Sequence, residues 1–147
     1  MAILLDTCVY IKMLRGQLPS KAAWLRPEKS NDLWLSSVVL QELYAGALPA
    51  DYPYLSDFAA VFRDNERILV PNLDDWKQAG IALNSLGRRY GFGHIKRARM
   101  TNDALIAMSC ARTGISLLTM NSGDFNRLAE FREFERREPA LALTSTP

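Results

Sequence analysis

Short apolar runs along the chain alternate with longer stretches in which apolar residues recur every three or four positions. The runs cover residues 3–5, 33–35, 68–70 and 115–119, and their length and composition are typical of buried strands. The longer stretches have the spacing of amphipathic helices. Alternating strands and helices predict a parallel sheet covered on both faces. We therefore expect a three-layer α/β/α fold with a short, mainly parallel central sheet.

The helical stretches have recognisable beginnings. Thr7 can cap a helix that ends near Gly16, and Ser36 or Ser37 can cap the next long one. Further helices are expected over residues 19–26, 50–65, 104–111 and 125–131. One more helix carries an apolar stripe made of Leu73, Trp76, Gly80, Leu83 and Tyr90. The tail leaves two alternatives open, an extension of the last helix over residues 132–138 or an edge strand over residues 141–143.

Length and composition are those of an ordinary soluble protein. The 147 residues are 48% hydrophobic and 23% charged, with a net charge of +2, which predicts one domain over residues 1–147 with one core. We find neither a signal peptide nor a run long enough to span a bilayer, so we expect a cytoplasmic protein. Cys8 and Cys110 lie in apolar helical patterns without metal-ligand spacing, which favours buried thiols.

Most acidic residues, including Asp74, Asp75 and those of segment 133–138, fit solvated positions. Four others follow a strand or lie on an apolar helix, namely Asp6, Glu42, Asp103 and Asp124. Asp6 ends the first strand, and ligands bind at the carboxyl edge of parallel sheets. Three of them also have a structural explanation. Asp6 could cap a helix, Asp103 could complement a helix dipole after a cap at Thr101 or Asn102, and Glu42 could pair with an arginine.

As a group, these carboxylates indicate a metal site. Acidic side chains that gather at one edge of a sheet repel one another, and divalent cations with oxygen ligands relieve this repulsion. Mg²⁺ or Mn²⁺ is the natural choice, and such a site suits phosphodiester hydrolysis by activated water. We expect Thr119 and Asn121 to orient a metal-bound water or a phosphate oxygen, although Asn121 also suits a plain turn.

A basic segment precedes Asp103. No acidic residue lies between Asp75 and Asp103, whereas Tyr90, Phe92 and His94 alternate there with cations and glycines. The candidate RNA-binding residues are Arg88, Arg89, Lys96, Arg97 and Arg99, because cations can follow phosphates while rings stack on bases. Two other interpretations remain open, a solvated loop and a surface for an acidic partner segment.

Four segments of the chain resemble PIN-domain nucleases, and within them the VapC-type toxins of bacterial toxin–antitoxin systems. They read LLDTCVYI, SSVVLQELYAGA, NDALIAMSCARTG and LLTMNSGDF, and they span nearly the whole chain. The resemblance places the four carboxylates on the family's acidic positions and Thr119 and Asn121 on its Thr-x-Asn element. It implies a Mg²⁺- or Mn²⁺-dependent endoribonuclease, a homodimer, and a small antitoxin partner. The family's last acidic position, here Asp124, is variable.

Other functions fit the residues less well. A metal-free ribonuclease with two histidines is excluded because the chain has one histidine, His94. An aspartate-nucleophile phosphatase would need a second carboxylate two residues after Asp6, where Cys8 stands. A non-catalytic RNA-binding or RNA-processing protein would have no reason to keep mutually repelling carboxylates. A single-stranded DNA nuclease remains open, because RNA is implied by the resemblance alone.

Overall fold

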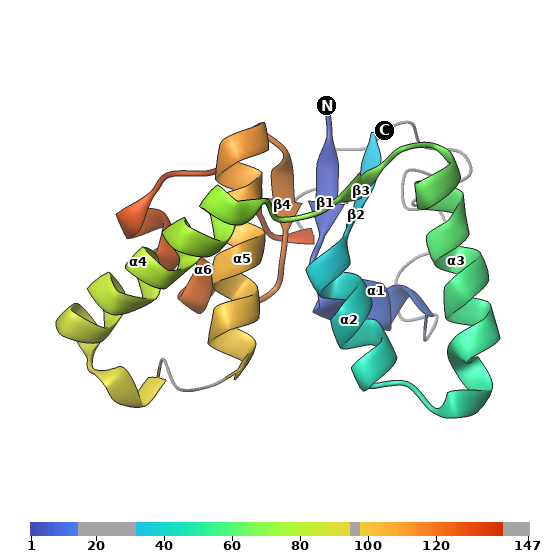
Figure 1. Ribbon diagram of the computed structural model, residues 1–147, viewed down its shortest axis with the longest axis horizontal. Coiled ribbons are helices and arrows are strands. Elements are labelled where there is room, and N and C mark those ends of the chain that lie inside the picture. The colour runs from blue at the N-terminus through green and yellow to red at the C-terminus, as the bar shows by residue number, and fades with distance from the viewer. Residues whose placement is uncertain (15–31, 95–97, 140–147) are drawn as a thin grey trace.

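A five-stranded sheet forms the centre of the computed structural model, which describes residues 1–14, 32–94 and 98–139 (Figure 1). The strands lie in the order β3-β2-β1-β4-β5, and every neighbouring pair is parallel. They are β1 (Ile3–Leu5), β2 (Leu33–Ser36), β3 (Ile68–Leu69), β4 (Ser116–Leu118) and β5 (Arg136–Arg137). The four apolar runs of the sequence are β1 to β4, which confirms the predicted parallel sheet.

Helices flank this sheet in two groups. They are α1 (Thr7–Leu14), α2 (Ser37–Ala45), α3 (Tyr52–Asp64), α4 (Leu73–Tyr90), α5 (Ala98–Thr113) and α6 (Ser122–Phe131), with short 3-10 helices η2 (Pro49–Asp51) and η3 (Phe92–His94). In the view of Figure 1, α4, α5 and α6 lie to the left of the strands, α1 and α2 lie below them, and α3 lies to the right. The predicted three-layer α/β/α fold is confirmed. None of the helices within the described residues is long and apolar enough to cross a membrane.

Local chemistry explains where several elements begin. Leu4 and Leu5 are fully buried in the central strand β1. Ser36 ends β2 and caps α2, because its Oγ accepts a hydrogen bond of 3.1 Å from the Val38 N–H. This confirms the predicted serine cap. The expected helix over residues 19–26, the helix end near Gly16 and the alternative strand over residues 141–143 lie outside the described residues.

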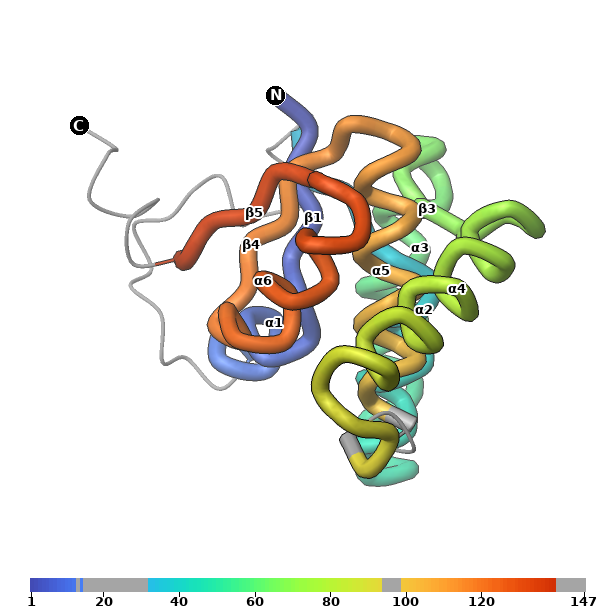
Figure 2. The backbone as a smooth tube through the Cα atoms, turned by 90° about the vertical axis from the view of Figure 1, so that its left-hand side faces the viewer, coloured from blue at the N-terminus to red at the C-terminus, as the bar shows by residue number. Residues whose placement is uncertain are grey.

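Helix α5 is the most deeply buried helix. Figure 2 shows it between β1 and α4, and residues 103–110 are all buried, as the sequence pattern predicts. The helix begins at Ala98 rather than near Asp103, so the predicted cap at Thr101 or Asn102 is wrong. Asp103 therefore lies beyond the first helical turn, where the dipole of the helix has little effect on a side chain.

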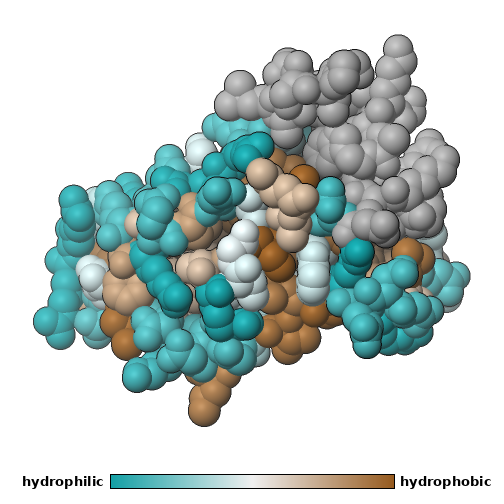
Figure 3. All heavy atoms as spheres, turned by 90° about the horizontal axis from the view of Figure 1, so that it is seen from above, coloured by the Kyte–Doolittle hydropathy of each residue, from teal (hydrophilic) through white to brown (hydrophobic). Residues whose placement is uncertain are grey.

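Helix α4 has a different buried face from the one that the sequence pattern predicts. Its buried face includes the small residues Ala79, Ala82 and Gly87 beside Leu86, whereas Leu73 is 85% and Trp76 55% exposed. The predicted apolar stripe through these two residues is wrong because small side chains let α4 pack closely against α5, which large ones would prevent. The helix runs from Leu73 to Tyr90, the two residues that bound the predicted stripe. Figure 3, seen from the end at which β1 begins, shows hydrophilic side chains around smaller apolar patches.

Asp75 contradicts its predicted place on the surface. Its side chain is fully buried and accepts hydrogen bonds of 3.0 Å from Arg112 Nε and 2.9 Å from the Asn72 N–H. Arg112 Nη2 lies 2.9 Å from Asp75 Oδ2. Asn72 and Asp75 form a reciprocal capping box at the start of α4. A pairing cation on the neighbouring helix α5 thus allows this carboxylate to be buried.

The structure rules out one of the two alternatives for the tail, in which the last helix extends over residues 132–138. Helix α6 ends at Phe131, and Arg136 and Arg137 form β5 instead. Leu117 N–H and Thr119 N–H donate hydrogen bonds of 2.9 and 3.0 Å to the carbonyls of Glu135 and Arg137. The tail therefore accepts hydrogen bonds from the backbone at the free edge of β4, and it pairs with β4 as a parallel strand.

Candidate active site

Asp6 and Thr119 meet at the carboxyl edge of the sheet, where the neighbouring strands β1 and β4 end. Both side chains are buried, Asp6 with 4% of its surface exposed. One oxygen of Asp6 accepts a hydrogen bond of 2.8 Å from the Thr7 N–H, and the other accepts one of 2.8 Å from Thr119 Oγ1. Asp6 thus also stabilises the start of α1, so its structural and chemical explanations are compatible.

Glu42 reaches the same edge from α2. Its Oε1 accepts a hydrogen bond of 2.8 Å from Thr7 Oγ1, which joins it to the first turn of α1. Burial raises the pKa of Glu42, and the charge of Asp6 raises it further, whereas the hydrogen bond from Thr7 lowers it. Within the described residues, Glu42 is held by a hydrogen bond from a hydroxyl group, and the charge of Arg99 also lowers its pKa.

Asp103 approaches from α5 and is 2% exposed. Burial, followed by repulsion from Asp6 and Glu42, raises the pKa of Asp103 to about 8. Asp124 adds to this repulsion, and Arg99 opposes it. At neutral pH the site therefore lacks the positive charge needed to keep all its carboxylates ionised.

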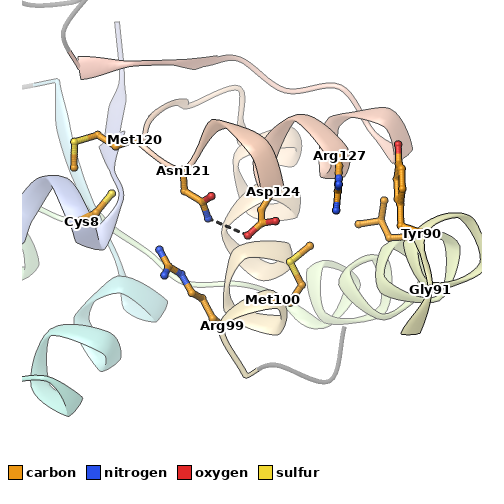
Figure 4. Close-up of a pocket in the computed structure, with 10 residues that line it drawn as sticks. Cys8, Tyr90, Gly91, Arg99, Met100, Met120, Asn121, Asp124 and Arg127 are labelled. Atoms are coloured by element: carbon orange, nitrogen blue, oxygen red, sulfur yellow. Dashed lines mark hydrogen bonds between the residues drawn. The ribbon is translucent and has the colours of Figure 1, made fainter. Parts of the chain in front are cut away.

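Asn121 links the last two carboxylates. Its Nδ2 lies 3.2 Å from Asp103 Oδ2 and 3.2 Å from Asp124 Oδ2. The Asn121 N–H also donates a hydrogen bond of 3.0 Å to Thr119 Oγ1. Figure 4 shows Asn121 directed toward Asp124, which lies in the first turn of α6. Asn121 therefore does more than form a turn, because its amide bridges two acidic side chains.

The predicted carboxylates thus come from four different elements and interact with one another at one edge of the sheet. Three polar side chains, Thr7, Thr119 and Asn121, hold them in place. Within the described ranges, no three Asp, Glu, His or Cys side chains form a ready-made metal-ligand group. The chemistry of the donors nevertheless fits a divalent cation, because they are hard oxygen ligands whose mutual repulsion a cation would offset.

The predicted basic residues divide into three groups. Arg99 lies at the site, where its charge lowers the pKa of Asp103 and its side chain extends into the space between Cys8 and Asp124 (Figure 4). Arg88 and Arg89 are exposed on the last turn of α4, and Arg89 pairs with Glu130 at 3.3 Å. The other two, Lys96 and Arg97, lie outside the described residues.

Three residues of the site are absent from the sequence-based prediction. Thr7 was expected only to cap a helix, and Arg127 had no expected role, although its i+3 spacing from Asp124 places both on one side of α6. Cys8 is half-buried rather than fully buried, and its Sγ lies 3.5 Å from Asp6 Oδ2. Burial and the charge of Asp6 raise the pKa of Cys8, which disfavours a reactive thiolate. Cys110 is buried as predicted.

Comparison with known proteins gives a consistent result. A family model described as PIN domain matches residues 3–131. Among solved structures, the chain is similar to DNA-bound VapBC from Salmonella typhimurium, with 17% identity over 94% of this chain and 98% of that one and a TM-score of 0.65. It is also similar to VapBC2 from Rickettsia felis bound to a promoter DNA fragment. The identity is 18%, the match covers 94% of this chain and 98% of that one, and the TM-score is 0.66.

A third similar structure is FitAB bound to the IR36 DNA fragment, with 24% identity over 93% of this chain and 94% of that one and a TM-score of 0.61. At these identities, the three likenesses show a shared fold. No curated protein sequence matches the chain. The family assignment therefore rests on the PIN domain model, which covers most of the chain.

Proposed function

This chain belongs to the PIN domain family, and from that membership and its carboxylate cluster we propose that it is a Mg²⁺- or Mn²⁺-dependent endoribonuclease that acts as the toxin of a type II toxin–antitoxin pair. The observation that carries the proposal is the environment of Asp103. It is a buried carboxylate near Asp6, Glu42 and Asp124, and its pKa is raised to about 8. Carboxylates so placed cost stability unless they serve a ligand.

In the proposed mechanism, the metal would be held by the four carboxylates of Asp6, Glu42, Asp103 and Asp124. When bound, a divalent cation lowers the pKa of a coordinated water and offsets the negative charge of a phosphodiester. Thr119 positions Asp6, Thr7 positions Glu42, and Asn121 positions the other two. These hydrogen bonds fix the orientation of the carboxylates before a cation arrives, as outer-sphere partners of metal ligands do.

The test is cleavage of a labelled single-stranded RNA with Mg²⁺ or Mn²⁺, with and without EDTA. We expect cleavage only with the free metal, and we expect Asp6→Asn to abolish it while the protein stays folded. Cleavage that EDTA leaves unchanged would refute the metal mechanism. A single-stranded DNA of the same sequence tests the remaining alternative, since cleavage of DNA but not RNA would refute the ribonuclease assignment.

A protein partner is also part of the proposal, because the similar solved structures are VapBC and FitAB complexes. A groove of about 410 Å³ lies beside Glu42 and is lined by Leu43, Leu48 and Tyr54 among others. Leu48 is 70% and Tyr54 59% exposed, so a partner that covers them would remove apolar surface from water. We expect the protein to co-purify with the product of a neighbouring small gene. The Leu48→Asp variant should lose this co-purification.

We also propose a homodimer, as the resemblance implies. Leu73 and Trp76 expose apolar surface on α4, which a second copy would cover. Light scattering should therefore give twice the chain mass of 16.6 kDa for the parent protein and a smaller mass for Trp76→Glu. A parent protein that is monomeric at high concentration would refute the homodimer.

A further inference from the structure

A pocket of about 330 Å³ lies beside the carboxylates, between α4, α5 and α6. Leu86 and Met100 line its apolar part, and Arg99, Arg127 and Tyr90 contribute cations and a ring. Figure 4 shows Arg99 and Arg127 on either side of Asp124, with Tyr90 beyond Arg127. Apolar side chains, planar groups and positive charge thus adjoin the carboxylates proposed to act on a phosphodiester.

Tyr90 and Arg127 form a stacked pair at this pocket. The Arg127 guanidinium carbon lies 4.5 Å from the centre of the Tyr90 ring, within the range of a cation–π interaction. The Tyr90 hydroxyl donates to Glu130 at 2.8 Å, and Arg89 also pairs with Glu130. These contacts fix the ring, and the ring in turn fixes the plane of the Arg127 guanidinium.

We propose that this pocket binds the nucleotide next to the cleaved phosphodiester, with its base stacked on the Tyr90–Arg127 pair and its phosphate facing Arg99. The proposal rests on the ribonuclease function proposed above and adds a binding site to it. Bases of single-stranded RNA stack on aromatic rings and on arginine planes. Leu86 and Met100 would pack against the apolar face of a base. A site for phosphate alone would not need such apolar side chains.

RNA affinity is measured in the Asp6→Asn background, which prevents cleavage, with a labelled single-stranded RNA of about 12 nucleotides, a length within known binding-site sizes. We expect Tyr90→Ala and Arg127→Ala each to weaken binding about tenfold, as loss of one stacked base does. Tyr90→Phe, which keeps the ring, should restore most of the affinity. The double variant should bind little worse than either single variant, because the two side chains act as one unit.

The control is Arg63→Ala, which removes an exposed cation on α3 that pairs only with its neighbour Asp64 among the described contacts. It should leave RNA affinity unchanged. A second measurement is competition by adenosine monophosphate, which should displace the RNA at a concentration about tenfold lower than ribose 5-phosphate does, because a stacked base adds affinity. Equal competition would overturn the base-binding role.

The outcomes separate this proposal from the one on which it rests. If the parent background binds RNA and the Tyr90→Ala and Arg127→Ala variants bind it equally well, the pocket proposal is wrong and the ribonuclease proposal stands. If active protein with Mg²⁺ or Mn²⁺ cleaves no RNA and the parent background binds none, both are wrong. Weakened binding in both variants, with Arg63→Ala unchanged, supports the pocket.

Discussion

Replacing Asp103 by asparagine should stabilise the metal-free protein and abolish its activity. The substitution keeps the shape of the side chain and its acceptor for Asn121 but removes one of the mutually repelling charges. The pKa of Asp103 rises from 3.8 to about 8 on folding, which is equivalent to at most about 6 kcal/mol at about 1.4 kcal/mol per pKa unit. Screening by water and movement of neighbouring groups reduce the expected gain to about 2 kcal/mol.

The gain should depend on pH with a definite sign. The folded chain holds the Asp103 proton more tightly than the unfolded chain does, so the stability of the parent protein falls as pH rises between about 4 and about 8. The asparagine variant lacks this dependence. The gap in the free energy of unfolding should therefore be small near pH 4 and widest above pH 8. Urea denaturation in EDTA at several pH values measures it.

Asp75→Asn is the matched control, because it makes the same chemical change at another buried aspartate. Asp75 pairs with Arg112 at 2.9 Å rather than facing other carboxylates. Losing this charge should lower the free energy of unfolding by about 2 kcal/mol, the value of a hydrogen bond to a charged group. The reasoning is refuted if Asp103→Asn is as destabilising as Asp75→Asn at pH 8, since burial alone would then govern both residues.

Three further predictions concern the groups around the carboxylates. Thr7→Val removes the hydrogen bond that lowers the pKa of Glu42, so the acidic limb of the pH–rate profile for RNA cleavage should move to higher pH. Arg112→Met leaves Asp75 buried without its cation and should cost about 3 kcal/mol of unfolding free energy in urea, with unchanged activity per folded molecule. Mg²⁺ should raise the melting temperature of the parent protein more than that of Asp103→Asn, as differential scanning fluorimetry would show.

The sequence predicted the sheet well because a buried strand appears in the sequence as a local run of apolar residues. A central parallel strand is apolar on both faces, and residues 3–5, 33–35, 68–70 and 115–119 stand out for that reason. Strand β5 has no such apolar run, because its two residues, Arg136 and Arg137, are polar and lie at the edge of the sheet. It forms through backbone hydrogen bonds to β4, which depend on the rest of the fold rather than on side-chain hydropathy.

The burial of α4 was predicted wrongly because hydropathy patterns weight large side chains. Ala79 and Ala82 are buried in α4, which packs mainly against α5, whereas Trp76 is exposed. Close approach of two helices selects small residues, and only the partner helix reveals which face is close. Asp75 was misassigned for the same reason, because its partner Arg112 lies 37 residues away in the sequence. Pairings of this kind have no local signal.

The same limit explains which parts of the site could be predicted. Asp6 and Asp103 were recognisable since each directly adjoins an apolar strand or helix. Asn121 was recognised from its place in the Thr-x-Asn element. Thr7 and Arg127 act through contacts between elements, and only their positions in the fold give them roles. The carboxylates therefore indicate a site for a divalent cation. The residues that orient them would determine the geometry in which they hold it. A substitution at Thr7 or Asn121 should alter the site without removing any proposed ligand, which separates orientation from coordination.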